Sequence, residues 1–157
     1  MKTDTQDKPI TRKVEEEEIE IEDISKEDIL QIIEEQKGEF GALYGLPIIS
    51  INDNQYAIAT DDKVAHDACT EYIKESLWAF NTSFLWAQTG IDEKVFETLA
   101  PLCEDANDAI RCLINDTCGL EQFVDEAIFA DGRGHFLGYY DSNEIELDGD
   151  MFAYCIN

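Results

Sequence analysis

The segment Leu46-Pro-Ile-Ile-Ser-Ile-Asn-Asp-Asn-Gln-Tyr-Ala-Ile-Ala-Thr60 carries the clearest structural pattern in this chain. Two apolar runs flank Asn52-Asp53-Asn54, and such turn-forming residues between alternating side chains favour a tight hairpin. The pattern predicts a β-hairpin with strands over residues 46–51 and 55–60. The side chains expected on its buried face are Ile49, Ile51, Tyr56 and Ile58.

The residues after this hairpin predict one long helix. Asp61-Asp62 favours a helix N-terminus, where the macrodipole stabilises negative charge. The helical pattern then continues to about Gln88 and ends near Gly90. Residues 77–86 are apolar on nearly every side, which is typical of a buried helix. We therefore expect a central helix inside the fold, with exposure of Trp78 or Trp86 to a partner as the alternative.

Shorter helices are predicted on both sides of this region. Upstream, Ser25 is placed to cap a helix that runs to about Lys37 and ends at Gly38. Downstream, helices are expected over residues 92–101, 105–116 and 120–130. The last of these would bury one face, formed by Phe123, Val124, Ala127 and Ile128.

The chain closes with a second predicted hairpin around Asp148-Gly149. Pairing across that turn would place Ile145 and Leu147 beside Phe152 and Tyr154, with Glu144 and Glu146 on the opposite face. The fold class is thus α+β: one domain over residues 25–157, in which two β-hairpins flank a cluster of helices with one long central helix. Residues 1–24 are expected to form an acidic, mobile N-terminal arm.

The strongest compositional feature is negative charge. The chain holds 36 acidic and 11 basic residues, a net of −25. Residues 1–37 account for 13 acids and 6 bases, so residues 38–157 hold 23 acids and 5 bases, a net of −18. Such charge disfavours binding to nucleic acid or anionic membranes and indicates a basic protein partner.

The magnitude of this charge is comparable with that of DNA. A globule of this size is about 35 Å across, and duplex DNA of that length carries about 20 charges. A surface that mimics DNA is therefore one hypothesis for the folded region. Several acids at predicted helix N-termini need no functional explanation. The remaining acids that we expect to face a partner are Glu121, Asp125, Glu144, Glu146, Asp148 and Asp150.

The segment Asp131-Gly-Arg-Gly-His135 holds the densest set of reactive side chains. In an enzyme, His135 could act as a general base, with Asp131 or Asp141 orienting it and Arg133 binding an anion. The alternative is that a glycine caps a helix while Arg133 pairs with a carboxylate. An acidic domain favours this alternative, because an anion site within it would be electrostatically unfavourable.

Neither a metal site nor a cofactor is expected. The five cysteines form an odd set without CxxC spacing and indicate reduced thiols. Asp141-Ser-Asn143 begins like a calcium loop, but Ile145 stands at a ligand position and the glycine is missing. Residues 1–20 lack an apolar signal core and no stretch is long enough to span a membrane, so we expect a cytoplasmic protein.

Three stretches resemble a family of small acidic proteins encoded by tailed bacteriophages. They are Tyr56-Ala-Ile-Ala-Thr-Asp61, Ser76-Leu-Trp-Ala-Phe-Asn-Thr-Ser-Phe84 and Asp131-Gly-Arg-Gly-His-Phe-Leu137 with Tyr140-Asp141. The resemblance spans roughly residues 43–157, although Gly138 stands where the family pattern has serine and Cys155 where it has arginine. It implies no catalytic residues; it implies a phage gene product acting in the host cytoplasm.

Three functional hypotheses follow from these observations. The first is a non-enzymatic accessory protein that binds a basic host or phage protein, in its specific form a DNA mimic that inhibits a nucleic-acid-binding or defence protein. The second is a small hydrolase or transferase with its site around Asp131, Arg133, His135 and Asp141. The third is an oligomeric structural phage component that associates through the helix carrying Trp78 and Trp86.

Overall fold

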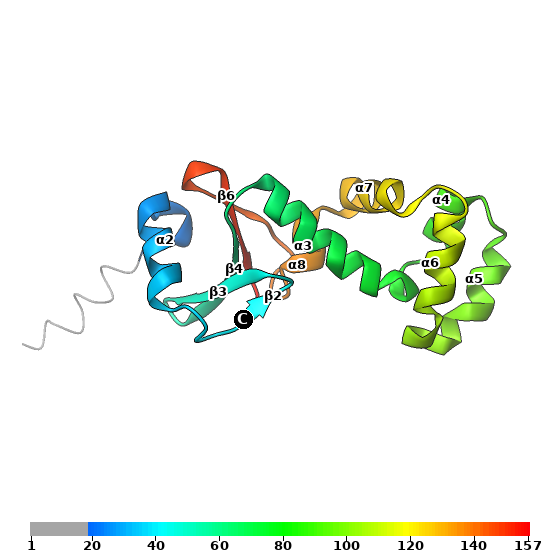
Figure 1. Cartoon of the computed structure of the whole chain (residues 1–157), viewed down its shortest axis with the longest axis horizontal. Coiled ribbons are helices and arrows are strands. Elements are labelled where there is room, and N and C mark those ends of the chain that lie inside the picture. Colours follow the sequence, from blue (N-terminus) through cyan, green and yellow to red (C-terminus); the bar gives the residue numbers. More distant parts are fainter. Residues whose placement is uncertain (1–18) are drawn as a thin grey trace, which may run out of the picture.

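The computed structural model describes residues 19–157 and has an α+β, single-domain architecture: a five-stranded antiparallel sheet joined to a cluster of helices (Figure 1). The sheet lies at one end of an elongated molecule and most helices lie at the other. Its strand order is β2-β3-β4-β6-β5. The strands are β2 (Ala42–Leu43), β3 (Leu46–Ile51), β4 (Asn54–Ala59), β5 (Ile145–Leu147) and β6 (Met151–Cys155).

The first predicted hairpin exists, but its second strand begins one residue earlier than expected, at Asn54, and its loop is Asn52-Asp53 alone. Strands β3 and β4 pair with Ile49 opposite Tyr56 and Ile51 opposite Asn54. This register leaves a two-residue loop, in which Asn52 and Asp53 both have positive φ, 54° and 70°. Positive φ at both loop positions defines a type I′ turn, whose twist matches that of the strands.

One face of the sheet is covered by the N-terminal elements of the described chain, η1 (Ile21–Asp23) and α2 (Lys26–Glu35). Ser25 caps α2, since its hydroxyl accepts a hydrogen bond from the Asp28 N–H at 3.1 Å. Ile21 is only 3% exposed and packs with Ile29 and the strand residues of this face. The expected mobile arm over residues 1–24 therefore does not extend to residue 24, because Ile21 packs against the sheet and η1 is part of the fold. Residues 1–18 lie outside the described part of the chain.

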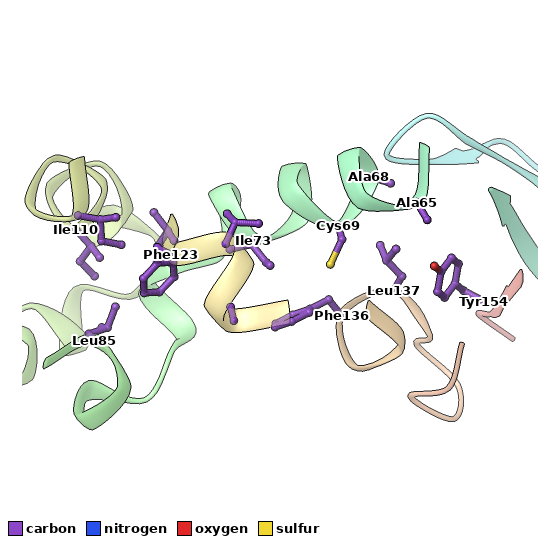
Figure 2. Packing of buried hydrophobic residues seen from close by; sticks show 14 of the residues in the cluster. Ala65, Ala68, Cys69, Ile73, Leu85, Ile110, Phe123, Phe136, Leu137 and Tyr154 are labelled. Atoms are coloured by element: carbon purple, nitrogen blue, oxygen red, sulfur yellow. The ribbon is translucent and has the colours of Figure 1, made fainter. Parts of the chain in front are cut away.

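The opposite face of the sheet packs against α3 (Asp62–Glu75) and α8 (Arg133–Leu137). Figure 2 shows the buried stripe of α3, from Ala65 to Ile73, directed toward residues of α8 and of the neighbouring helices. One continuous apolar cluster thus extends from Tyr154 in the sheet through Leu137 and Phe136 to Phe123, Leu85 and Ile110 among the helices.

The expected long central helix is wrong. Helix α3 ends at Glu75, and two separate elements follow it, η2 (Leu77–Ala79) and α4 (Thr82–Thr89). Asn81 begins α4, since its side-chain oxygen accepts a hydrogen bond from the Ser83 N–H at 2.8 Å. The apolar residues at 77–86 indicated burial correctly for Leu77 and Leu85, but Trp86 is 51% exposed.

A side chain from another helix stabilises this break. Asn107 donates to the Lys74 carbonyl at 2.7 Å and accepts from the Trp78 N–H at 3.1 Å. Arg111 also donates to the Lys74 carbonyl, at 3.0 Å. These bonds satisfy backbone groups that a continuous helix would have paired internally. The break is thus fixed by a residue about thirty positions away in the sequence.

The remaining helices follow the predicted segments closely. They are α5 (Glu93–Leu99), α6 (Asn107–Asn115) and α7 (Leu120–Asp131); the connection between α5 and α6 is a further element that was not predicted, η3 (Ala100–Ala106). Helix α7 buries Phe123, Val124 and Ala127, as its apolar stripe predicts, and Ile128 is partly buried. Within residues 19–157, no helix has the length and apolarity needed to cross a membrane.

The second hairpin exists, but its predicted register is wrong by one residue. Leu147 pairs with Met151, and Ile145 with Ala153. The connection is the three-residue η4 (Asp148–Asp150) rather than a two-residue turn. Each residue of β5 therefore pairs with the β6 residue one position further along the chain than expected. As a result Glu146 lies opposite Phe152, and Glu144 approaches Tyr154.

Replacement of Asn107 by alanine should lower the free energy of unfolding by about 1–3 kcal/mol, because the Trp78 N–H loses its partner in a partly buried position. Urea denaturation monitored by circular dichroism measures this change. Asn115→Ala, at the exposed end of the same helix, is the matched control and should change stability by less than about 0.5 kcal/mol. Equal effects of the two substitutions would contradict the role of Asn107.

Asp53→Gly should raise the free energy of unfolding by about 0.5–1 kcal/mol, since glycine adopts the φ of 70° without steric cost. Asp53→Ala should lower it, because alanine lacks both the freedom of glycine and the local hydrogen bonding of aspartate. The same urea titration distinguishes them. Destabilisation by glycine would show that the turn is not type I′ in solution.

Candidate functional site

The structure separates the four side chains of the predicted catalytic set. Gly132, with φ 84° and ψ 153°, ends α7 and reorients the chain into α8. Asp131 and His135 consequently line one pocket, whereas Arg133 is directed to the sheet. Asp141 lies in the turn after α8, where its carboxylate accepts from the Asn143 N–H at 3.1 Å and does not line that pocket.

Arg133 is held by carboxylates. Its Nε donates to Glu144 Oε2 at 2.7 Å, and its Nη1 donates to Asp62 Oδ1 at 3.0 Å. The guanidinium carbon also lies 4.8 Å from the centre of the Phe152 ring. The Arg133 side chain is only 11% exposed. Burial alone would lower the pKa of Arg133, but the hydrogen bond and charge of Glu144, together with Asp62, raise it overall.

Tyr154 completes this group from the centre of the sheet. Its hydroxyl donates a short hydrogen bond to Glu144 Oε2, and burial together with Glu144 raises the pKa of Tyr154 above its usual range. The group therefore joins α3, α8, the residue that precedes β5 and strand β6. Nε and Nη1 of Arg133 are engaged with carboxylates and its side chain is poorly exposed, so a stabilising role accounts for Arg133.

The two buried cysteines, Cys69 and Cys155, are not suited to act as nucleophiles. Burial raises the pKa of Cys69 to about 12, and burial also raises that of Cys155. A protonated, buried thiol is a poor nucleophile. Among residues 19–157, no three His, Cys, Asp or Glu side chains are grouped so that they could hold a metal ion.

The pocket beside Asp131 and His135 has a volume of about 270 Å³ and lies at the break between α3 and α4. It is lined by Tyr72, Ser76, Ala79, Phe80, Asn81, Asp131, His135 and Phe136. The helix break creates this hollow, because the chain from Ser76 to Asn81 turns away from the axis of α3. Sequence reasoning missed its aromatic wall, which could be assigned only once the break was known.

The six predicted partner-binding acids do not form one patch. Glu121 and Asp125 lie on α7, whereas Asp148 and Asp150 lie in the second hairpin, at the sheet end (Figure 1). Glu144 is engaged with Arg133, and the Asp148 carboxylate accepts from the Lys26 N–H at the start of α2. Glu146 and Asp150 are exposed. The other four acids are exposed and form neither a pair with Arg133 nor a hydrogen bond at the start of α2; they are Glu121, Asp125, Glu146 and Asp150.

The outer face of α7 has one further feature, the 88% exposure of Phe129. Glu121, Asp125 and Glu126 are exposed on the same helix. Asp125 is also 3.6 Å from His66 Nε2. Phe129 falls outside the buried stripe of α7, which is the signal by which the sequence could have identified it.

Comparisons with protein-family models, with curated proteins and with solved structures found no match for this chain. The resemblance to phage proteins therefore stays a prediction from the sequence.

Glu144→Gln should lower the free energy of unfolding by about 1–3 kcal/mol, because the poorly exposed Arg133 loses its nearest counter-charge. Asp62→Asn removes the other carboxylate, which is 80% exposed, and should cost less than about 1 kcal/mol. Urea denaturation of both variants at neutral pH makes the comparison. A larger loss for Asp62→Asn would show that the exposed pair is the stabilising one.

Proposed function

We propose that this protein is a non-enzymatic binding protein whose acidic surface docks onto a basic protein. The observation that carries the proposal is the exposure of its carboxylates. Residues 19–157 contain thirty acids and seven bases, and all of these acids except Glu93 and Glu144 are exposed. Ordinary surfaces mix both signs of charge, so an excess of this size favours a cationic partner.

Charge pairing within residues 19–157 occupies several of their few cations and leaves the net excess of acids unchanged. Three of the seven bases already pair with carboxylates of the chain. Lys63 contacts Asp67 at 2.7 Å, Lys74 contacts Glu71 at 3.2 Å, and Arg133 is enclosed by its two carboxylates. The net negative field around the protein would steer a basic partner toward it.

In its specific form, the proposal is that the protein occupies the nucleic-acid-binding site of its basic partner. It would do so as a phage-encoded inhibitor in a bacterial cytoplasm. An elongated body supports it, because acids at both ends would span a groove made for a nucleic-acid backbone (Figure 1). The enzyme alternative lacks such support, since Arg133 is engaged with carboxylates and does not face the pocket.

The test is displacement of DNA-binding proteins. Bacterial lysate is bound to a DNA column at about 0.05 M salt, and the purified protein is applied as eluent, with polyglutamate of equal net charge as control. We expect selective elution of one or a few basic proteins that polyglutamate does not release. Each eluted protein is then purified, and its displacement from fluorescent DNA should weaken steeply at about 0.3 M salt. Elution no better than that by polyglutamate would overturn the proposal.

Neutralisation of Glu121 and Asp125 should weaken this displacement more than neutralisation of Glu104 and Asp105 in η3. Both double substitutions to glutamine and asparagine remove two exposed charges, so long-range attraction falls equally and only a contact surface distinguishes them. We expect about a tenfold difference in the concentration for half-displacement. Equal losses would place the partner elsewhere on the acidic surface.

A further inference from the structure

The pocket at the helix break combines an aromatic wall with unpartnered acceptors. Phe136 contacts both Tyr72 and Phe80, with ring centres 5.9 Å apart in each case. Phe136 is 5% exposed and forms the deep part of the wall, whereas Tyr72 and Phe80 are half-buried. Faces of aromatic rings carry partial negative charge and attract cations that approach them.

The polar groups of the pocket are the Asp131 carboxylate, which accepts hydrogen bonds, and the side chains of Tyr72, Ser76, Asn81 and His135, which can both donate and accept. In the described part of the chain, no hydrogen bond or ion pair engages the Asp131 carboxylate or the hydroxyls of Tyr72 and Ser76, all of which line it. Asn81 is different, since its side-chain oxygen is used by Ser83. A ligand with several N–H donors would therefore find partners that the protein itself leaves open.

The electrostatics of the pocket select a cation. Its titratable lining residues are Asp131, His135 and Tyr72. No lysine or arginine of residues 19–157 lines it, and Arg133 is directed away to Glu144 and Asp62. The surrounding surface carries a large excess of carboxylates. An anionic ligand would meet repulsion from Asp131 and from the whole surface, whereas a cation is favoured by both.

The size of the pocket indicates a single side chain. Sites for whole small molecules usually measure about 300–1,000 Å³, and this one measures about 270 Å³ and is open on one side. Among side-chain cations, a guanidinium is the better match, because it is planar, weakly hydrated and able to donate to several acceptors while it stacks on a ring. An ammonium is a more strongly hydrated point charge and gains less from an aromatic wall.

We propose that this pocket binds the guanidinium group of an arginine presented by the basic partner, with Asp131 as its counter-charge and Tyr72, Phe80 and Phe136 as its aromatic wall. This inference rests on the proposed function for the source of the arginine, but the pocket itself can be tested without a partner. The pocket lies next to the C-terminal end of α7, the helix that also carries the exposed Glu121 and Asp125.

The probe is Nα-acetyl-arginine amide, titrated into the full ¹⁵N-labelled chain and followed by amide chemical shifts. We expect saturable shifts at residues 72, 76, 79–81, 131 and 135–136. Nα-acetyl-citrulline amide has nearly the same shape without the charge and should cause none; the lysine amide should bind several-fold more weakly. Equal shifts with citrulline would overturn the proposal, and so would shifts confined to other surfaces. Equal binding of lysine would overturn the choice of guanidinium.

The matched variants are Asp131→Asn and Glu126→Gln. Both residues are exposed on α7, but only Asp131 lines the pocket. We expect Asp131→Asn to weaken arginine-amide binding about tenfold and Glu126→Gln to leave it unchanged. Equal affinities would exclude Asp131 as the counter-charge. Circular dichroism of each variant verifies that it is folded before the titration is interpreted.

The same variants separate this inference from the proposed function. Displacement of DNA-binding proteins that persists undiminished in Asp131→Asn, together with no arginine-amide shifts, would overturn the pocket and leave the proposed function standing. Arginine-amide binding without any displacement would overturn the proposed function and leave the pocket standing. The pocket would then be a cation site that serves some other activity.

Discussion

The packing of α3 is the interaction on which the rest of the structure depends. Its buried stripe contains Ala65, Ala68 and Cys69 toward the sheet and Ile73 toward the helices (Figure 2). Small side chains at the sheet end let the helix approach β4, whose facing residues Ala57 and Ala59 are also small and fully buried. Because both ends of the molecule pack on one helix, the apolar cluster is continuous.

The end of α3 at Glu75 determines where the molecule is hollow. A helix that continued to Gln88 would lack the turn from Ser76 to Asn81, whose residues Ser76, Ala79, Phe80 and Asn81 line the pocket. Instead, Asn107 takes over the backbone groups at the break, and Asn81 starts α4 in a new direction. Among the described residues, the one buried side-chain nitrogen or oxygen without a hydrogen-bond partner is the Nε of nearby Arg111.

The distribution of charge follows from the cost of burying it. Residues 19–157 have no fully buried charged side chain, and the carboxylates accordingly cover the exterior. The partial exception is the group of Arg133, Glu144 and Tyr154, where Glu144 Oε2 accepts from both Arg133 Nε and the Tyr154 hydroxyl. Breaking such a pair leaves a poorly solvated charge, so the group stabilises the second hairpin against α3 and α8.

Local patterns in the sequence predicted the elements well where short-range chemistry decides them. The first hairpin follows from its turn residues and its alternating isoleucines, the α2 cap from Ser25, and the buried face of α7 from its helical spacing. The same patterns could not predict the second hairpin register, because a loop of two or three residues around Gly149 is equally compatible with the sequence.

The α+β class, the hairpin at residues 46–59 and the acidic exterior could be predicted before folding was considered, because they depend on propensity, periodicity and net charge. The folded chain was needed to reveal the break after Glu75, the pairing of Arg133 with Glu144, and the separation of Asp131 and His135 from that pair. Each of these depends on groups far apart in the chain, such as Asn107 with Lys74, whose proximity no local pattern contains.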